Sequence, residues 1–226
     1  MDFQDVKTYR DLQDSNILFL EGGLNRTPYH HGPVDPETIP LLNDLVNIND
    51  LGFISVMGQP ALNDVKFVDK TWTIPGSSQI RGNWWYQVMQ RSFIEGYLPK
   101  AYLETFIEFM DTQPDYYYRV YDIQSGWFSS VRLVEIKDTF PSSFFNITKE
   151  RVSYDLQTLD QAQWEYYSNI TADMTPPFDF SGYPNIVKVM IPHTVKIIIS
   201  SRGYNSGSVE QLLLNFFYSL HKIMGN

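Results

Sequence analysis

Long stretches of alternating apolar and polar residues constrain this fold more than any other feature of the sequence. Residues 65–74 and 79–97 alternate in this way and are rich in Val, Ile, Phe, Trp and Tyr, and Pro75, Gly76 and two serines lie between them. Alternation with a period of two is typical of strands that bury one face, and such a Pro-Gly-Ser cluster is typical of a turn. The sequence therefore predicts an antiparallel hairpin in this region.

A second hairpin is predicted over residues 116–123 and 127–136, around a short loop that contains Gly126. Residues 137–157 have no clean period, and we expect them to be mostly irregular. Three further strands are expected, at 53–57, 186–191 and 194–200.

Helical patterns are interspersed with these strands. Asp35, Pro36 and Glu37 are typical of a helix start, and apolar residues follow at helical spacing until Gly52. A last helix is predicted to begin at Ser208, and its apolar residues surround much of its circumference, which implies burial in the core or against a partner. Other helices are expected at 2–13, after Pro99 and from 160 to 170.

These patterns together predict an α+β protein, with a mainly antiparallel sheet covered by helices and a long apolar C-terminal helix. A chain of 226 residues can bury a substantial core, and no repeat or low-complexity segment divides it. We therefore expect a single domain over residues 1–226.

Charge and composition exclude several classes of function. The chain carries 17 Lys and Arg against 26 Asp and Glu, a formal net charge of −9, so it repels phosphate backbones and is not expected to bind nucleic acid. The absence of cysteine excludes disulfides, thiolate catalysis and cysteine-based metal sites. No secretory signal pattern and no membrane-length apolar run is present, so we expect an intracellular protein that does not enter a membrane.

Aromatic residues make up 15% of the chain, including 15 Tyr. Large aromatic side chains mostly serve packing, but they also supply contact area at protein interfaces. The composition is therefore compatible with a well-packed core, or with a homodimer or another protein partner.

The densest set of reactive groups is the loop that carries His30, His31 and Asp35. Two imidazoles and a carboxylate could hold a ligand or move protons. In the structural interpretation, Asp35 caps the following helix and the histidines bond to the backbone. The other histidines, His193 and His221, have no metal-ligand spacing relative to this loop, so no metal is expected.

A second candidate is the segment around Arg91 and Glu95, whose alternation places both side chains on one side of a strand. They could pair with each other or with neighbouring strands. Alternatively, Arg91 could bind an anionic ligand beside the carboxylate of Glu95. Gln59, in a Gly-Gln-Pro turn, is the third segment of this candidate site. No phosphate-binding loop, nucleophile elbow or zinc-protease motif is present, so no cofactor is expected.

Three stretches of the sequence carry a family resemblance: residues 29–38, residues 51–54 with Gly58, Gln59, Pro60 and Ala61, and residues 90–96. They resemble a family of uncharacterised proteins of large DNA viruses of amoebae, of the marseillevirus type, and of some actinobacteria. The family's usual turn is Ser-Gln-Pro-Gly, and here Gly58 and Ala61 replace its first and last residues. The resemblance covers roughly residues 20–97 and implies a viral origin, but no activity.

Two hypotheses follow. In the first, this is a non-enzymatic structural or interaction protein, a virion component that associates with itself through aromatic surface and the C-terminal helix. In the second, it is an enzyme or small-ligand-binding protein whose pocket is formed by residues 29–35, 58–61 and 90–96. The absence of catalytic motifs favours the first.

Overall fold

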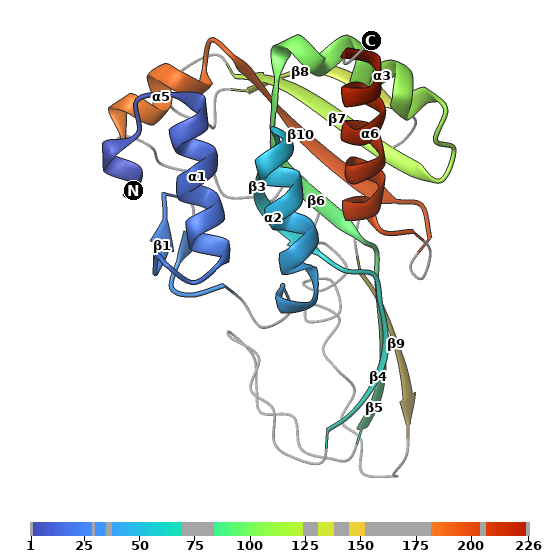
Figure 1. Ribbon diagram of the computed structural model, residues 1–226. Helices are drawn as coiled ribbons and strands as arrows, with labels where there is room; N and C mark the ends of the chain where they lie inside the picture. Colours follow the sequence, from blue (N-terminus) through green and yellow to red (C-terminus); the bar gives the residue numbers. More distant parts are fainter. Residues whose placement is uncertain are drawn as a thin grey trace.

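Helices and antiparallel strands alternate along the chain, which confirms the α+β class (Figure 1). The computed structural model describes residues 2–28, 30–34, 38–68, 84–123, 131–137, 145–151, 182–203 and 207–224. The helices are α1 (Tyr9–Leu20), α2 (Leu42–Leu51), α3 (Leu103–Asp111), α5 (Pro184–Met190) and α6 (Val209–Met224), with 3₁₀ turns η1 (Phe3–Asp5), η2 (Ile39–Leu41) and η3 (Lys100–Tyr102).

The described strands form three antiparallel sheets. The largest has the order β3-β6-β10-β7-β8, the second has the order β4-β5-β9, and β1 pairs with β2. In Figure 1 the second sheet extends away from the layer of helices. The strands are β1 (Arg26–Thr27), β2 (His30–His31), β3 (Ile54–Gln59), β4 (Leu62–Val68), β5 (Trp84–Gln90), β6 (Phe93–Pro99), β7 (Tyr116–Ile123), β8 (Val131–Lys137), β9 (Phe145–Arg151) and β10 (Thr194–Ser201).

Both predicted hairpin pairings are confirmed. Strand β4 pairs with β5, with Val65 opposite Gln87, and β7 pairs with β8, with Tyr121 opposite Leu133. The predicted turns at 75–78 and 124–126 lie outside the described residues, as do the predicted helix at 160–170 and the helix start at Asp35.

The prediction of one continuous strand over 79–97 is wrong. Strand β5 ends at Gln90, β6 begins at Phe93, and the two strands belong to different sheets. Between them, the hydroxyl of Ser92 accepts a hydrogen bond of 3.1 Å from the backbone N–H of Val209, at the start of α6. This contact between residues far apart in sequence holds the chain where it passes from one sheet to the other, and alternation alone does not reveal it.

Three other predictions need correction. Residues 186–191 were expected as a strand, but α5 covers most of them, because Pro184 suits a first helical turn and Ile186 and Met190 share one buried helical face. The first helix begins later than expected, after a capping box between Thr8 and Asp11, and runs to Leu20. Strand β9 lies within 137–157, where no strand was expected, and its partner is β5.

Helices α1, α2 and α6 lie side by side on one face of the five-stranded sheet (Figure 1). Helix α2 ends at Gly52, as predicted, with a φ of 125° that favours glycine. In α6, Leu213, Phe216 and Phe217 are fully buried. The apolar side of the C-terminal helix therefore packs into the core of this chain, while self-association stays a prediction.

Asn49 of α2 is the centre of a buried polar network that joins α1, α2 and β3. Its Nδ2 donates to Leu45 O and to Ser55 Oγ, both at 2.7 Å. Its Oδ1 accepts from Asn16 Nδ2 at 2.7 Å and from the backbone N–H of Ser55 at 3.2 Å. All four hydrogen-bonding positions of the amide are used, as burial of such a group requires.

The start of α6 contains a buried carboxylate. Ser208 caps the helix, as predicted, by accepting from the backbone N–H of Gln211 at 3.1 Å. Glu210 is 1% exposed, and its Oε2 accepts from Ser208 Oγ at 2.7 Å. Burial raises the pKa of Glu210 above its ordinary value of 4.5, because desolvation disfavours the charged form more than the bond from Ser208 favours it.

We expect Glu210→Gln to change how stability depends on pH. A raised pKa in the folded state means that this carboxyl lowers the free energy of unfolding as the pH rises above 4.5 towards the raised value. The variant lacks this loss, so its stability relative to the parent should increase as the pH rises through 4.5 towards the raised pKa of Glu210. Urea unfolding at several pH values measures the difference. Glu108→Gln, a change at an exposed residue of α3, is the control. If the stability difference between Glu210→Gln and the parent varies with pH no more than that of the control, the prediction is contradicted.

Candidate functional site

The five-stranded sheet has one face against the helices and a second face that carries the charged groups. Side chains of a strand alternate between faces, and the strand register arranges those of the second face in rows across β6, β10 and β7. One row is Phe93, Ser200 and Tyr117, and the next is Glu95, Ile198 and Arg119. Lys196 and Tyr121 follow in the third row. We call these residues, together with Arg91 and Arg202 at the same end as the first row, the ionic face.

The centre of the ionic face is an ion pair between Lys196 Nζ and Glu95 Oε1, at 2.7 Å. The two side chains are 10% and 2% exposed. Removing two charges from water is costly, and only close pairing offsets that cost. Glu95 is therefore held as the counter-ion of Lys196.

Three arginines belong to the same face. Arg91 Nη1 donates to Ser201 O at 3.2 Å, and Arg119 Nη1 donates to the hydroxyl of Tyr121 at 3.4 Å. The guanidinium of Arg202 lies 4.4 Å from the centre of the Tyr117 ring, a cation–π contact. Ser92 points to α6, so the alternation of the chain directs Arg91 to the opposite side. The ionic face is therefore rich in arginine, in a chain whose net charge is −9.

An apolar cluster lies among these charges. Phe93 and Ile198 are buried there, and Met57, Tyr117 and Tyr121 pack against them. This cluster is separate from the main core on the helical face. The ionic face thus combines aromatic rings with guanidinium groups, a combination that suits ligands with a planar ring and an anionic group.

The structure brings two of the three predicted site segments together. In the register of β3 and β6, Gln59 is opposite Phe93, and Phe93 comes two residues after Arg91 in the sequence. Glu95 is opposite Met57. The side chain of Gln59 is outside the described part of the structure. The backbone pairing therefore places residues 58–59 beside 93–94, and the pocket expected from these segments stays a prediction.

The histidine loop is in a different place, on the hairpin of β1 and β2 beside α1. The ring of His30 lies 5.7 Å from that of Phe19, and its Nε2 is 2.9 Å from Pro33 O. This contact with the backbone fits the structural interpretation of His30. His31 pairs with Arg26 through the backbone, and Asp35 lies outside the described residues. Across the described ranges, no group of three or more His, Asp or Glu side chains is placed to hold a metal ion.

Sequence reasoning did not identify Lys196, Arg119 or Arg202 as candidates. One signal was available: Lys196 interrupts the otherwise apolar run of 195–199, in a strand that is buried along its whole length. A charge at such a position predicts a buried partner. The partner itself could not be deduced, because Glu95 and Lys196 are 101 positions apart.

No described helix is both long enough and apolar enough to cross a membrane.

Comparison with known proteins gives a partial match. Residues 3–106 match a domain of unknown function (DUF6919). The chain is also 28% identical over 129 residues to a methylenetetrahydrofolate reductase (NADH) 1 of Zea mays, which covers 56% of this chain and 20% of the reductase. A probable methylenetetrahydrofolate reductase (NADH) of Oryza sativa subsp. japonica is 28% identical over 130 residues, with the same coverage. The chain thus spans about a fifth of the length of the curated relatives that it matches.

Proposed function

We propose that this chain is a binding protein, not an enzyme, and that its ligand is a small molecule with a planar ring and a carboxylate or phosphate group. The ligand would contact the ionic face at the end formed by Arg91, Arg202 and Tyr117. The single observation that carries the proposal is the grouping of three arginines beside an aromatic cluster, on one sheet face of an acidic chain.

Guanidinium groups supply the anionic half of this recognition. The planar fork of arginine matches a carboxylate or phosphate with two parallel hydrogen bonds, and such charged bonds are stronger than neutral ones. Arg202 is oriented by its position over Tyr117, and Arg119 by its contact with Tyr121. Both guanidinium groups are therefore preorganised, which lowers the entropy cost of binding.

Glu95 supports binding more than catalysis. A carboxylate that acts as a general base must be able to reach a proton of the substrate. Glu95 is almost fully buried and is engaged with Lys196 at 2.7 Å. In this arrangement its role is to balance the charge of Lys196, and the contacts to an anion would come from guanidinium groups of the ionic face.

The match to the reductases covers only a small part of their length, which agrees with a role in ligand binding and not in the whole reaction. The relatives are named as reductases, but the part that this chain resembles is about a fifth of their length. We propose that this shared part binds a ligand and that the reaction belongs to other parts of those enzymes. NADH and a reduced folate are the natural first probes, since the names of the relatives contain NADH and methylenetetrahydrofolate.

A binding panel tests the proposal. Isothermal titration calorimetry would measure the dissociation constants of ATP, NADH, a reduced folate, adenosine and inorganic phosphate. We expect at least one ligand with both a ring and an anionic group to bind about tenfold or more tightly than adenosine or phosphate alone. Arg202→Gln should weaken that ligand about 10- to 100-fold, as expected for the loss of charge-assisted hydrogen bonds.

Arg26→Gln is the matched control, because Arg26 is an exposed arginine on β1 and is not part of the ionic face. It removes the same charge and should leave affinity within about twofold, since a single distant charge is well screened. Equal losses in both variants, or no binding of any panel member, would contradict the proposal. Oxidation of NADH in the presence of the reduced folate would replace it with an enzymatic function.

A further inference from the structure

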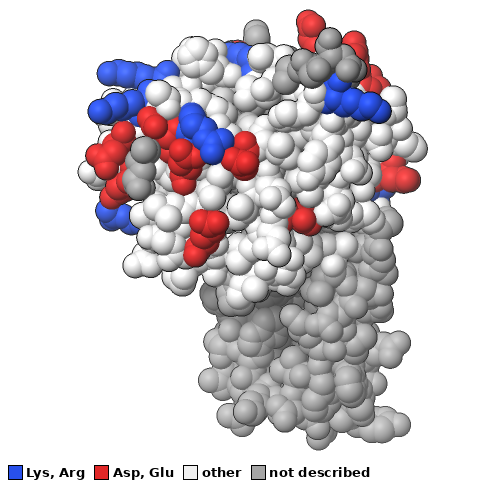
Figure 2. Space-filling model, in the orientation of Figure 1, with Lys and Arg blue, Asp and Glu red and all other residues white. Residues whose placement is uncertain are grey.

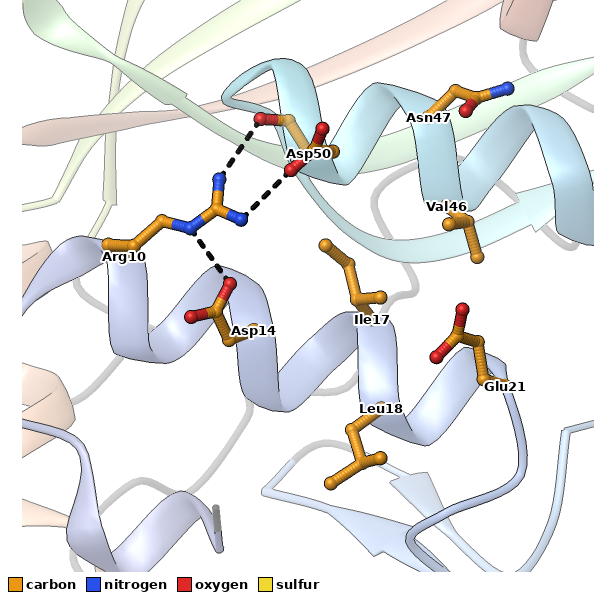
Figure 3. A pocket seen from close by; sticks show the side chains of 8 residues that line it. All are labelled: Arg10, Asp14, Ile17, Leu18, Glu21, Val46, Asn47 and Asp50. Carbon is orange, nitrogen blue, oxygen red and sulfur yellow. Dashed lines mark hydrogen bonds and ion pairs between the residues drawn. The ribbon is translucent and has the colours of Figure 1, made fainter.

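A groove of about 510 Å³ lies between α1 and α2, away from the ionic face. Arg10 at the start of α1 meets Asp50 at the end of α2, so the two helices are antiparallel. Ile17 and Val46 line the groove between the helices, and Leu18 adds to its apolar surface (Figure 3). Two neighbouring antiparallel helices with an apolar floor form a natural cradle for a third helix.

Carboxylates border both ends of this groove. At one end, Asp14 and Asp50 bind Arg10 from opposite sides, at 2.8 and 2.9 Å. At the other end is Glu21, for which the described residues provide no ion pair. Three carboxylates against one guanidinium leave the lining with an excess of negative charge. Figure 2 shows charged side chains gathered over α1 and the adjoining part of α2, whereas the surface over α6 carries few.

The spacing of these groups along α1 defines what could occupy the groove. Asp14, Ile17 and Glu21 lie three and four residues apart, so they form one stripe on the helix. At a rise of about 1.5 Å per residue, the carboxylates of the stripe are separated by roughly 10 Å, with the apolar residue between them. A partner helix that presents a basic residue, an apolar residue and a second basic residue over two turns would match all three.

We propose that the α1–α2 groove is a docking site for a basic amphipathic helix of another protein. Its apolar side chain would pack on Ile17 and Val46. Its two Lys or Arg residues, about seven positions apart, would pair with Glu21 at one end and with Asp14 and Asp50 at the other. Complementary charge is the reason for choosing this partner: an acidic helix would be repelled at both ends of the groove.

The test uses a fluorescent synthetic helical peptide of about 15 residues, with Leu on one face and Lys two turns apart, and a second peptide with Glu in place of Lys. Fluorescence anisotropy measures binding to the full chain. We expect the Lys peptide to bind, and to bind more weakly as sodium chloride rises from about 50 to 200 mM, because salt screens surface charge. The Glu peptide should not bind.

Variants distinguish docking from general attraction to an acidic protein. Glu21→Lys reverses one charge at the end of α1, where a basic residue is compatible with the helix dipole, and should weaken the Lys peptide about tenfold. Glu108→Lys reverses the same charge on α3, which does not line the groove, and should change affinity less than about threefold. Ile17→Thr, which adds no charge, should weaken binding about threefold or more. Equal losses in the two charge reversals, no effect of Ile17→Thr, or no binding of the Lys peptide would overturn the proposal.

Discussion

Replacing Lys196 with Met is expected to lower the free energy of unfolding by about 3–5 kcal/mol, because it leaves Glu95 buried without its counter-ion. The carboxylate is 2% exposed and lies 2.7 Å from Lys196 Nζ, so water cannot replace the lost partner without rearrangement of the sheet. Met has a similar length and shape, which keeps the packing of β10 and isolates the effect of the charge. Urea unfolding followed by circular dichroism gives the value.

Two controls separate burial from charge. Lys100 pairs with Asp122 at 3.0 Å, but these side chains are 40% and 29% exposed. Lys100→Met should therefore cost less than about 1 kcal/mol. The double variant Lys196→Met/Glu95→Gln removes both charges and should recover part of the loss from the single change. If Lys196→Met costs no more than Lys100→Met, Glu95 is not isolated from water as the structure indicates.

Asn49→Leu is the second change with a large expected effect, a loss of about 3–5 kcal/mol, because several buried polar groups lose partners at once. The backbone N–H of Ser55 loses an acceptor, and the Nδ2 group of Asn16 loses its bond to Asn49 Oδ1. Leu has the same branched skeleton of side-chain heavy atoms as Asn but is larger, so the substitution leaves no cavity, and the loss combines missing hydrogen bonds with some overpacking. Urea unfolding measures this loss as well.

Asn47→Leu is the matched control for this prediction. Asn47 is two residues earlier on the same helix, and its side chain is exposed. The same substitution there should change stability by about 0.5 kcal/mol or less. Similar values at both positions would show that the network around Asn49 contributes little to stability.

Local patterns were sufficient for many of the elements. The turn-separated alternating runs identified the pairs β4–β5 and β7–β8, and glycine at position 52 marked the end of α2. Ser208 marked the start of α6. These features depend on residues close in sequence, such as a cap and the N–H groups that it satisfies, so short windows contain the necessary information.

The candidate site could be predicted only in part. Arg91 and Glu95 were found because alternation fixes which side of a strand they occupy. The partners of these residues are on β10 and β7, and no local pattern states that β10 lies between β6 and β7. His30 was grouped with them by residue type, but the structure places it on a hairpin beside α1. Chemical type thus identified candidates, and strand order decided which of them are neighbours.

By itself, the sequence determined the α+β class, two hairpin pairings and the N-cap of the last helix, because propensity, periodicity and capping act between near neighbours. The tertiary structure decided where the run of 79–97 divides between two sheets, and that residues 184–190 are helical. It also decided that Lys196 neutralises Glu95. The division between sheets and the ion pair depend on contacts between distant segments, and α5, which Pro184 starts locally, packs on α1 and η1.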